Sequence, residues 1–259
     1  MSNTNKILSL SLLSAGIALS AGQAFGHAGF QPSPDGSPVK YIEGKTVYPT
    51  IVIGHDCSEG EKHFPVVEVV AMPPQGHTLT RIAKPVSGQP VQVIENAMMW
   101  DWGTAQPSMT AGFGKAETRN GPLHPSGEGT RALVWRGGKL PGSQYAGFSF
   151  RARAGWQTPL FPADACVNQA VYYMPIIQYC SKKKAEAWLL ESTPSFPTNG
   201  SSPSVTVLRD TASNPLPVGC TSPETWYFYP PASDIDQFMY RSTSSAHAPV
   251  HGHPPVHRH

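Results

Sequence analysis

Residues 130–153 read TRALVWRGGKLPGSQYAGFSFRAR, and this stretch carries the clearest signal for the fold class. Two runs rich in β-branched and aromatic residues, TRALVW at 130–135 and YAGFSFR at 145–151, are separated by the turn-forming segment GKLPGS. In the second run, FSFRAR alternates apolar and polar residues, as a strand buried on one face does. The stretch therefore predicts two short β-strands.

The same pattern recurs on both sides of this stretch. Further runs rich in Val, Ile, Tyr and Thr lie at 46–53, 64–71, 91–94, 170–177, 185–190, 205–208 and 226–229. Turn-forming segments such as PPQG and SGQP separate them. The run AEAWLL at 185–190 also fits a short helix by propensity. Short strands in this number and spacing predict an all-β fold, a β-sandwich.

Composition argues against several other classes of protein. The 259 residues include 24 Gly and 27 Pro, and only 14% are charged. That Gly and Pro content is well above the usual share of about 12%. Proline costs about 3 kcal/mol inside a helix, which argues against a helical bundle, and the long helices of a doubly wound α/β enzyme are not found. The formal charge of +2 gives no electrostatic reason to expect a nucleic-acid partner.

Residues 1–26 are typical of a secretory signal peptide. Lys6 provides the positive start, and the uncharged run ILSLSLLSAGIALSA at 7–21 is shorter than the ~20 residues that cross a membrane. Small residues then offer two cleavage points, after Ala24 or after Gly26. The second makes His27 the first residue of the mature chain. We expect a periplasmic or secreted protein without a membrane anchor after cleavage.

The cysteines fit an exported chain. An even number of cysteines in an oxidising compartment predicts disulfides, and four cysteines allow three pairings. None of them lies in the CxxC motif of zinc ribbons and thioredoxin-like centres. They are Cys57, Cys166, Cys180 and Cys220.

The composition changes after Glu191. Residues 192–240 form a Pro/Ser-rich extension that opens with STPSFPTNGSSPS, and Cys220 offers a tether back to the main domain. Residues 241–259 form a His-rich tail without apolar periodicity, which we expect to be disordered without a ligand. Neutral imidazoles at such spacing predict a second, weaker site for Cu(II), Zn(II) or Ni(II). The tail histidines are His247, His251, His253, His257 and His259.

Four segments, in their order and spacing, resemble one known family. They are GHDC at 54–57, SGEGTRALVWRGGKLPGSQYAGFSFRAR at 126–153, YYMPIIQYC at 172–180 and AEAWLLE at 185–191. Together they make residues 27–191 similar to the YcnI-like family of exported copper-binding domains. The resemblance implies an immunoglobulin- or cupredoxin-like β-sandwich over these residues. It also implies that Cys57 pairs with Cys180, which leaves Cys166 to pair with Cys220.

The resemblance further implies a Cu(II) site called a mono-histidine brace. In this sequence the brace position falls on His27, the carboxylate on Glu128 and the accompanying tryptophan on Trp188. An N-terminal histidine offers its α-amine and its ring Nδ1 to one ion, and such nitrogen ligands suit Cu(II). The indole face of the tryptophan can shield the cation from water.

Other residues offer metal ligands, each with a plainer explanation beside it. His124, four residues before Glu128, is either an additional ligand or a solvated loop residue. His55 is either a ligand or a turn residue beside a disulfide at Cys57. The segment MMWDW at 98–102 is either a soft surface for Cu(I) or ordinary packing. No GxSxG, HExxH, Walker or GxGxxG motif is present in the sequence.

The residues and the resemblance together predict a non-enzymatic protein that sequesters, carries or delivers Cu(II). Its expected partner is another periplasmic or membrane copper-handling protein. The first alternative is a histidine-brace copper monooxygenase acting on polysaccharide. It needs a second histidine at the copper, for which the sequence offers His55, His63, His77 and His124. The second alternative is a metal-free exported interaction domain.

Overall fold

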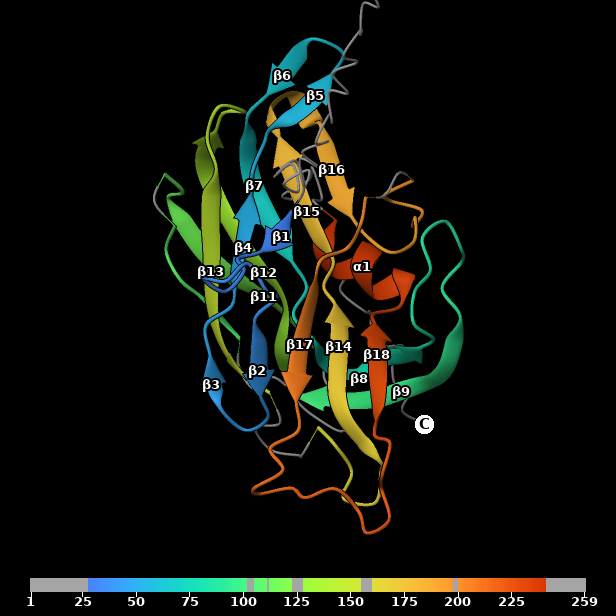
Figure 1. The fold of residues 1–259 in the computed structure, drawn as a ribbon. Coiled ribbons are helices and arrows are strands. Elements are labelled where there is room, and N and C mark those ends of the chain that lie inside the picture. The colour runs from blue at the N-terminus through green and yellow to red at the C-terminus, as the bar shows by residue number, and fades with distance from the viewer. Residues whose placement is uncertain are drawn as a thin grey trace, which may run out of the picture.

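The computed structural model describes residues 28–101, 105–110, 112–122, 128–154, 160–197 and 200–240 (Figure 1). These residues form three main sheets, a small hairpin, one α-helix and one 3-10 turn. The fold is an all-β sandwich, as the strand pattern of the sequence predicts.

The first sheet, called here the β4–β13 sheet, is built around the run YAGFSFRAR. Strand β13 (Ala146–Arg153) lies between β4 (Thr50–Ile53) and β10 (Gln106–Pro107). Strand β1 (Gly29–Phe30) forms the edge beyond β4, and β3 (Thr46–Val47) pairs with the C-terminal end of β13. The first described strand of the chain is therefore an edge strand.

The second sheet, called the β7–β15 sheet, holds the run TRALVW. Its strands, all antiparallel to their neighbours, lie in the order β11 (Lys115–Pro122), β12 (Glu128–Leu140), β7 (Val66–Ala71), β15 (Ile176–Cys180) and β16 (Ala185–Trp188). Strands β7 and β15 are almost uninterrupted apolar runs, VVEVVA and IIQYC. Such runs are typical of strands with both faces covered.

The third sheet, called the β14–β18 sheet, shares two chain segments with the second. β7 leads into β8, and β14 leads into β15, so the two sheets follow each other along the molecule (Figure 1). The order of its strands is β2 (Lys40–Ile42), β17 (Ser204–Leu208), β14 (Val167–Tyr173), β18 (Glu224–Tyr229), β8 (Gln75–Ile82) and β9 (Val93–Asp101).

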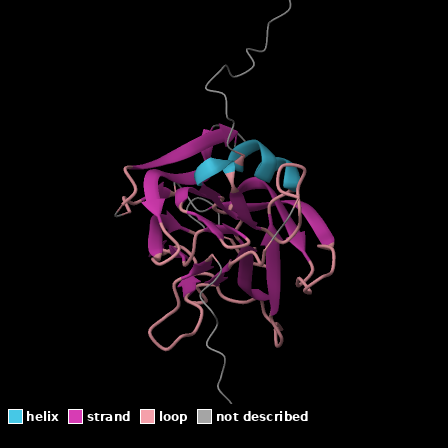
Figure 2. Ribbon diagram, turned by 90° about the horizontal axis from the view of Figure 1, so that it is seen from above, coloured by secondary structure: helices cyan, strands magenta, loops and turns pink. Residues whose placement is uncertain are grey.

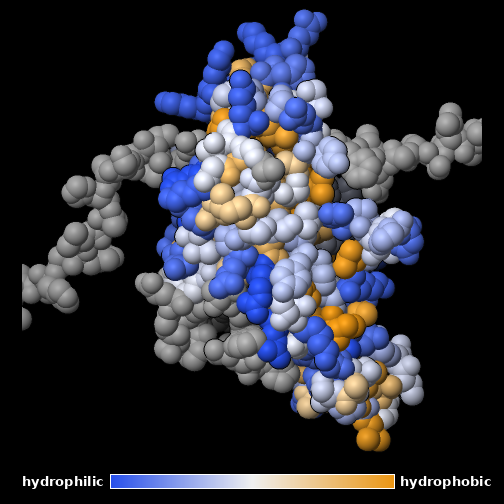
Figure 3. Space-filling model, turned by 90° about the vertical axis from the view of Figure 1, so that its left-hand side faces the viewer, coloured by the Kyte–Doolittle hydropathy of each residue, from blue (hydrophilic) through white to orange (hydrophobic). Residues whose placement is uncertain are grey.

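A small hairpin and a 3-10 turn lie at the opposite end of the molecule from the β14–β18 sheet (Figure 1). The hairpin pairs β5 (Cys57–Glu59) with β6 (Lys62–Phe64), and the turn η1 (Ser181–Lys183) connects β15 to β16. Glu59 of the hairpin forms an ion pair with Lys184 at 2.7 Å. Figure 3 shows that hydrophilic residues gather at this end of the molecule.

The main core is formed by buried residues of all three main sheets, including the facing sides of the β4–β13 and β7–β15 sheets. Ile51 and Phe148 are register partners on β4 and β13, and both are fully buried. The indole ring of Trp135 on β12 lies 5.5 Å from the Phe148 ring, centroid to centroid. Burying side chains of this size contributes roughly 1.5–3 kcal/mol each, so these contacts hold the two layers together.

Helix α1 (Ala232–Met239) covers the outer face of the β7–β15 sheet. Ile235 and Met239 are fully buried in a second apolar cluster that includes Val134 of β12. Asp234 of the helix forms a buried ion pair with Arg131 on the same strand. Figure 2 shows the helix outside the strands. Sequence analysis predicted no helix here, and the structure corrects that omission.

Prolines split three of the predicted strands. The runs at 46–53, 64–71 and 170–177 each contribute to two strands, which separate at Pro49, Pro65 and Pro175. Proline has no N–H to donate to a β-ladder, so a central strand ends or bends there. The run at 185–190 forms strand β16 and not a helix.

The segment after Glu191 belongs to the sandwich. Strand β17 pairs antiparallel with β14, and β18 pairs parallel with β14 on its other side. These two strands confirm the predictions at 205–208 and 226–229. Sequence analysis ended the sandwich domain at Glu191 and treated 192–240 as an appendage, but this segment supplies two strands and α1 to the shared cores.

Both disulfides have the pairing that the resemblance implied. Cys57 is bonded to Cys180, and Cys166 is bonded to Cys220. Two disulfides indicate an oxidising compartment outside the cytosol. In the described part of the chain, no helix has the length and apolar character that crossing a bilayer requires.

Candidate metal site

The start of the described chain lies beside the segment that leads to His55. His27 itself lies outside the described residues, which begin at the buried Ala28. Gly29 of β1 pairs with Val52 of β4 in an antiparallel register. Because antiparallel strands run in opposite directions, the beginning of β1 meets the end of β4, where the chain continues to His55.

Trp188 is fixed at the edge of the opposite sheet. Its side chain belongs to the main core, and only 5% of the residue is exposed. The His55 ring lies against it at 5.7 Å between centroids, in an edge-to-face arrangement at 75°. Gly200 packs against the same indole so closely that a Cβ there would lie 2.5 Å from Trp188 Cε3. His55 and Trp188 thus bridge the two sheets next to the start of β1.

Backbone contacts determine which ring nitrogen of His55 carries the proton. Nδ1 lies 2.5 Å from the backbone carbonyl oxygen of Asp56. A carbonyl oxygen only accepts hydrogen bonds, so Nδ1 is the donor and the neutral ring keeps its lone pair on Nε2. The side chain is 29% exposed, which leaves the ring partly accessible. In its neutral form His55 therefore carries its lone pair on Nε2, the ring nitrogen that can bind a metal.

Asp56 connects this histidine to the β12–β13 turn and to strand β6. Its carboxylate is buried and accepts hydrogen bonds from the backbone N–H of Gly142, at 3.1 Å, and from Nδ1 of His63, at 3.0 Å. Gly142 lies in the GKLPGS turn between β12 and β13, the segment at the centre of the sequence signal. The His63 side chain is 65% exposed. One aspartate thus holds Nδ1 of two histidines, through its carbonyl for His55 and its carboxylate for His63.

Glu186 places a carboxylate beside the His55 ring. It lies two residues before Trp188 on β16, and its Oε2 is 3.8 Å from His55 Nδ1. Its oxygens also accept hydrogen bonds from the Ser58 N–H, at 3.2 Å, and from Gln178 Nε2, at 3.0 Å. Sequence analysis missed Glu186, although its spacing from Trp188 places both residues on the same face of the strand.

Gln178 adds a buried polar group beside Glu186. The two residues are register partners on β15 and β16, and Gln178 is 1% exposed. Its Oε1 has no hydrogen-bond partner among the described residues. An unsatisfied buried acceptor costs about 1–3 kcal/mol, so a site beside it favours a donor or a cation.

The backbone register separates Glu128 from Trp188. Leu133, Ala71, Ile176 and Trp188 lie in one row across four neighbouring strands, which spans about 14 Å at normal strand spacing. Glu128 begins β12 five residues before Leu133, about 17 Å further along the strand. The backbone of Glu128 is therefore distant from that of Trp188. The side chain of Glu128 lies outside the described residues, so its role as a ligand stays a prediction.

Most of the remaining candidates lie outside the described residues. His124, Trp102 and the tail residues 241–259 fall outside the described residues. The side chain of His77 is likewise not described. Met98 and the rest of β9 belong to the β14–β18 sheet, where Met98 pairs with Leu79. The additional metal ligands predicted at His124 and in the tail stay predictions.

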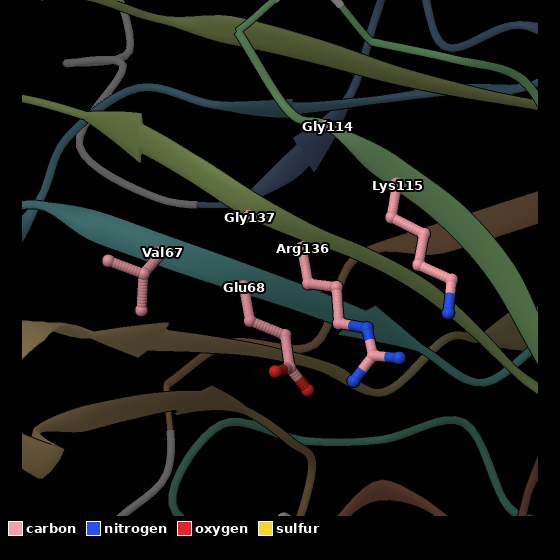
Figure 4. Close-up of a pocket in the computed structure, with 6 residues that line it drawn as sticks. All are labelled: Val67, Glu68, Gly114, Lys115, Arg136 and Gly137. Carbon is pink, nitrogen blue, oxygen red and sulfur yellow. The ribbon is translucent and has the colours of Figure 1, made fainter.

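A hollow on the β7–β15 sheet offers no competing site. It is lined by Val67 and Glu68 of β7, by Gly114 and Lys115, and by Arg136 and Gly137 of β12 (Figure 4). Its charged groups already have partners. Glu68 pairs with Arg119 at 3.0 Å, and Glu117 pairs with Lys115 at 2.6 Å and with Arg136 at 2.8 Å.

The described side chains do not complete a metal site by themselves. Within the described ranges, no three His, Cys, Asp or Glu residues are grouped so that they could hold a metal ion. His55 offers one ring nitrogen. Glu186 provides oxygen atoms on the Nδ1 side of the ring, and Gln178 is hydrogen-bonded to Glu186. Nitrogen and oxygen donors fit Cu(II), provided that further ligands come from outside the described residues.

The fold and the site define a class: a disulfide-linked all-β sandwich with a histidine–tryptophan pair between its β4–β13 and β7–β15 sheets. No protein-family model matches the chain, and no curated protein matches its sequence.

Proposed function

We propose that this protein is exported to the periplasm or the extracellular space and binds Cu(II) at its mature N-terminus. His27 is the brace residue, and Trp188 lies beside the ion, as the resemblance to the YcnI-like family implies. The protein sequesters the ion or passes it to another copper-handling protein. It uses no catalytic residues in this role.

The observation that carries the proposal is the position of the His55–Trp188 pair. The ring pair joins the two sheets at 5.7 Å, and the antiparallel β1–β4 register brings the start of the described chain to the same place. Ala28, the residue after His27, is buried and so anchors the chain there. In this proposal the α-amine and the imidazole of His27 bind the ion beside Trp188 and His55.

The proposal assigns the carboxylate to Glu186 instead of Glu128. Glu186 is fixed by hydrogen bonds to Ser58 and Gln178 and lies at the His55 ring. Bound Cu(II) would supply a redox-active ion, which the buried indole of Trp188 partly shields from water.

A Cu(II) titration against a competing chelator tests the proposal. Two forms are compared in a protein whose five tail histidines are replaced by alanine, called here the tail-free variant. One form begins at His27 and the other retains Gly26. We expect one tight equivalent for the first form and loss of most of that affinity for the second, because Gly26 converts the α-amine of His27 into an amide. Equal affinities, or no tight binding, would contradict the proposal and favour the metal-free interaction domain.

The second imidazole also favours one alternative function. A histidine-brace monooxygenase requires an additional histidine at the copper, and His55 lies beside Trp188. Incubation of the copper-loaded protein with chitin or cellulose, a reductant and oxygen tests this activity. Oxidised oligosaccharides that appear only with oxygen would establish the enzyme, and their absence alongside tight copper binding would support the carrier.

A further inference from the structure

We propose that the outer face of the β4–β13 sheet binds an uncharged polysaccharide chain. This proposal goes beyond copper binding and does not depend on it. The face is the side of the sheet that points away from the main core, and it is called here the tyrosine face. It carries Tyr48, Thr50 and Val52 along β4, and Tyr145, Gly147 and Ser149 along β13.

Strand alternation separates the tyrosine face from the core. In β13, Phe148 and Phe150 are buried, while Gly147 and Arg151 are exposed. β4 alternates in the same way, with both of its isoleucines buried. The two strands pair side by side on the left of Figure 1. Their outward residues therefore lie on one shared surface.

Two exposed tyrosines lie at the ends of this surface. Tyr145 is 79% exposed and Tyr48 is 66% exposed, the highest values of any aromatic residue in the described part of the chain. Tyr145 directly precedes β13. The register of β13 with β4 and β3 places Tyr48 opposite Arg151, six residues after Tyr145. The two tyrosines are therefore about 20 Å apart along the strands.

Small and polar residues occupy the surface between the tyrosines. Gly147 is the register partner of Val52, and Ser149 is the register partner of Thr50. The hydroxyls of Ser149 and Thr50 are hydrogen-bonded at 2.7 Å. The Ser108 hydroxyl donates to the Ser149 carbonyl at 2.9 Å. These hydrogen bonds hold three hydroxyl groups in a row across neighbouring strands, with an exposed ring beyond each end of the surface.

These groups match the chemistry of a sugar. A pyranose has C–H groups on the faces of its ring and hydroxyls around the edge. An exposed phenol ring can pack against such a C–H face while its own hydroxyl stays in water. Serine and threonine hydroxyls both donate and accept hydrogen bonds, as sugar hydroxyls do. A protein partner would instead need an apolar centre to bury, and the centre of the tyrosine face is polar.

Charge and extent define the ligand further. The charged residues of β4 and β13 are Arg151 and Arg153, and Arg153 Nε donates to the Gly44 carbonyl at 2.5 Å. So few charges give an ionic polymer little to bind, which favours an uncharged ligand. One sugar unit contacts only one of two rings that lie about 20 Å apart. A chain can contact both, and linked contacts reinforce each other.

The experiment measures binding to cellulose, chitin and soluble β-glucan. It uses the tail-free variant that begins at His27, with EDTA present to remove metal ions. Depletion from solution measures binding to the two insoluble polymers, and affinity electrophoresis measures binding to the glucan and to the anionic polymer alginate.

The variants separate the tyrosine rings from other exposed groups. Tyr48→Ala and Tyr145→Ala each remove one ring, and Tyr48→Phe and Tyr145→Phe keep the ring without its hydroxyl. Tyr240→Ala is the matched control, because Tyr240 is 50% exposed but lies at the end of helix α1. Circular dichroism melting confirms that each variant is folded.

We expect the parent protein to bind at least one of the three uncharged polymers and to bind alginate more weakly. Each alanine variant at Tyr48 or Tyr145 should bind that polymer at least about fivefold more weakly, whereas the phenylalanine variants and Tyr240→Ala should stay within about twofold of the parent. The proposal is wrong if the parent binds none of the three, if it prefers alginate, or if Tyr240→Ala loses as much affinity. Tyrosine-dependent self-association without polysaccharide binding would assign the face to a second copy of the chain and would also overturn the proposal.

Discussion

At the scale of single residues, the position of the Trp188 indole depends on the small size of its neighbour. Gly200 donates its N–H to the Ala187 carbonyl at 2.8 Å and forms a β-bridge with Trp188, so its backbone lies against the ring. A Cβ at this position would lie 2.5 Å from Cε3 and 2.8 Å from Cζ3. Glycine is therefore required here for the close approach of backbone and ring.

We predict that Gly200→Ala lowers the free energy of unfolding by about 1–3 kcal/mol, because the indole must shift within a packed core. Urea denaturation measures the loss, and the fluorescence maximum of the folded protein reports the ring movement. Gly29→Ala is the control, since its Cβ would meet nothing within 4 Å, and it should change the stability by less than about 0.5 kcal/mol. Equal effects of the two substitutions would show that Trp188 is not confined as described.

The residues of the site differ in how far sequence could predict them. The cysteine pairing followed from the resemblance because the quoted segments contain Cys57 and Cys180. The resemblance put the carboxylate on Glu128, but a motif fixes a position along the chain and not the strand register, which separates the backbone of Glu128 from Trp188. Asp56 and Glu186 were missed because their roles are hydrogen bonds made across loops and strands.

At the scale of elements, strands β14 and β18 carry two buried tyrosines. The hydroxyl of Tyr172 donates to the Met72 carbonyl at 3.0 Å, and the hydroxyl of Tyr229 accepts from the Leu190 N–H at 3.0 Å. Burial raises the pKa of Tyr172 well above its usual value, and the neighbouring Tyr229 adds to the rise. Burial also raises the pKa of Tyr229, against the lowering effect of the hydrogen bonds from Leu190 and Glu191.

These pKa shifts predict a loss of stability in alkali. Below pH ~10 the phenols are protonated in both folded and unfolded chains, so they add no pH dependence. Above pH ~10 the unfolded chain releases its phenolic protons while the folded protein retains them, so the free energy of unfolding falls as pH rises. Urea unfolding from pH 8 to 11.5 should show this decline, and Tyr229→Phe should make it shallower. The exposed Tyr145, changed to Phe, should leave the slope unaltered. An unchanged slope in Tyr229→Phe would refute the assignment.

Predictability also varied among the elements. The sequence predicted the strands that contain β-branched or aromatic runs. The predicted boundaries were wrong at Pro49, Pro65 and Pro175, where one apolar run forms two strands. Sequence analysis missed strand β11, whose sequence is KAETRNGP. This segment has no strand-like composition, and it forms a strand because it pairs with β12. Helix α1 has only eight residues, and it is stabilised by packing of Ile235 and Met239 on the sheet.

At the scale of the whole molecule, the sandwich brings distant parts of the chain to one point. β1 is the edge of the β4–β13 sheet, and β16 is the edge of the β7–β15 sheet, with His55 and Trp188 in contact between them. The strand pattern predicted the sandwich, and the resemblance implied a site shared by His27 and Trp188, which stays a prediction. The contact of His55 with Trp188 depends on how the β4–β13 and β7–β15 sheets meet. The copper proposal therefore depends on whether the mature chain begins where β1 can hold its α-amine.

The most direct measurement is N-terminal sequencing of the exported protein by mass spectrometry or Edman degradation. We predict that the mature chain begins His27-Ala28-Gly29-Phe30, with a free α-amine on His27. Cleavage after Ala24 would instead leave Phe25 and Gly26 before His27, and the nitrogen of His27 would then be an amide nitrogen that cannot bind copper as an amine. A mature chain that begins at Phe25, or one that retains residues 1–26, would contradict the N-terminal copper site.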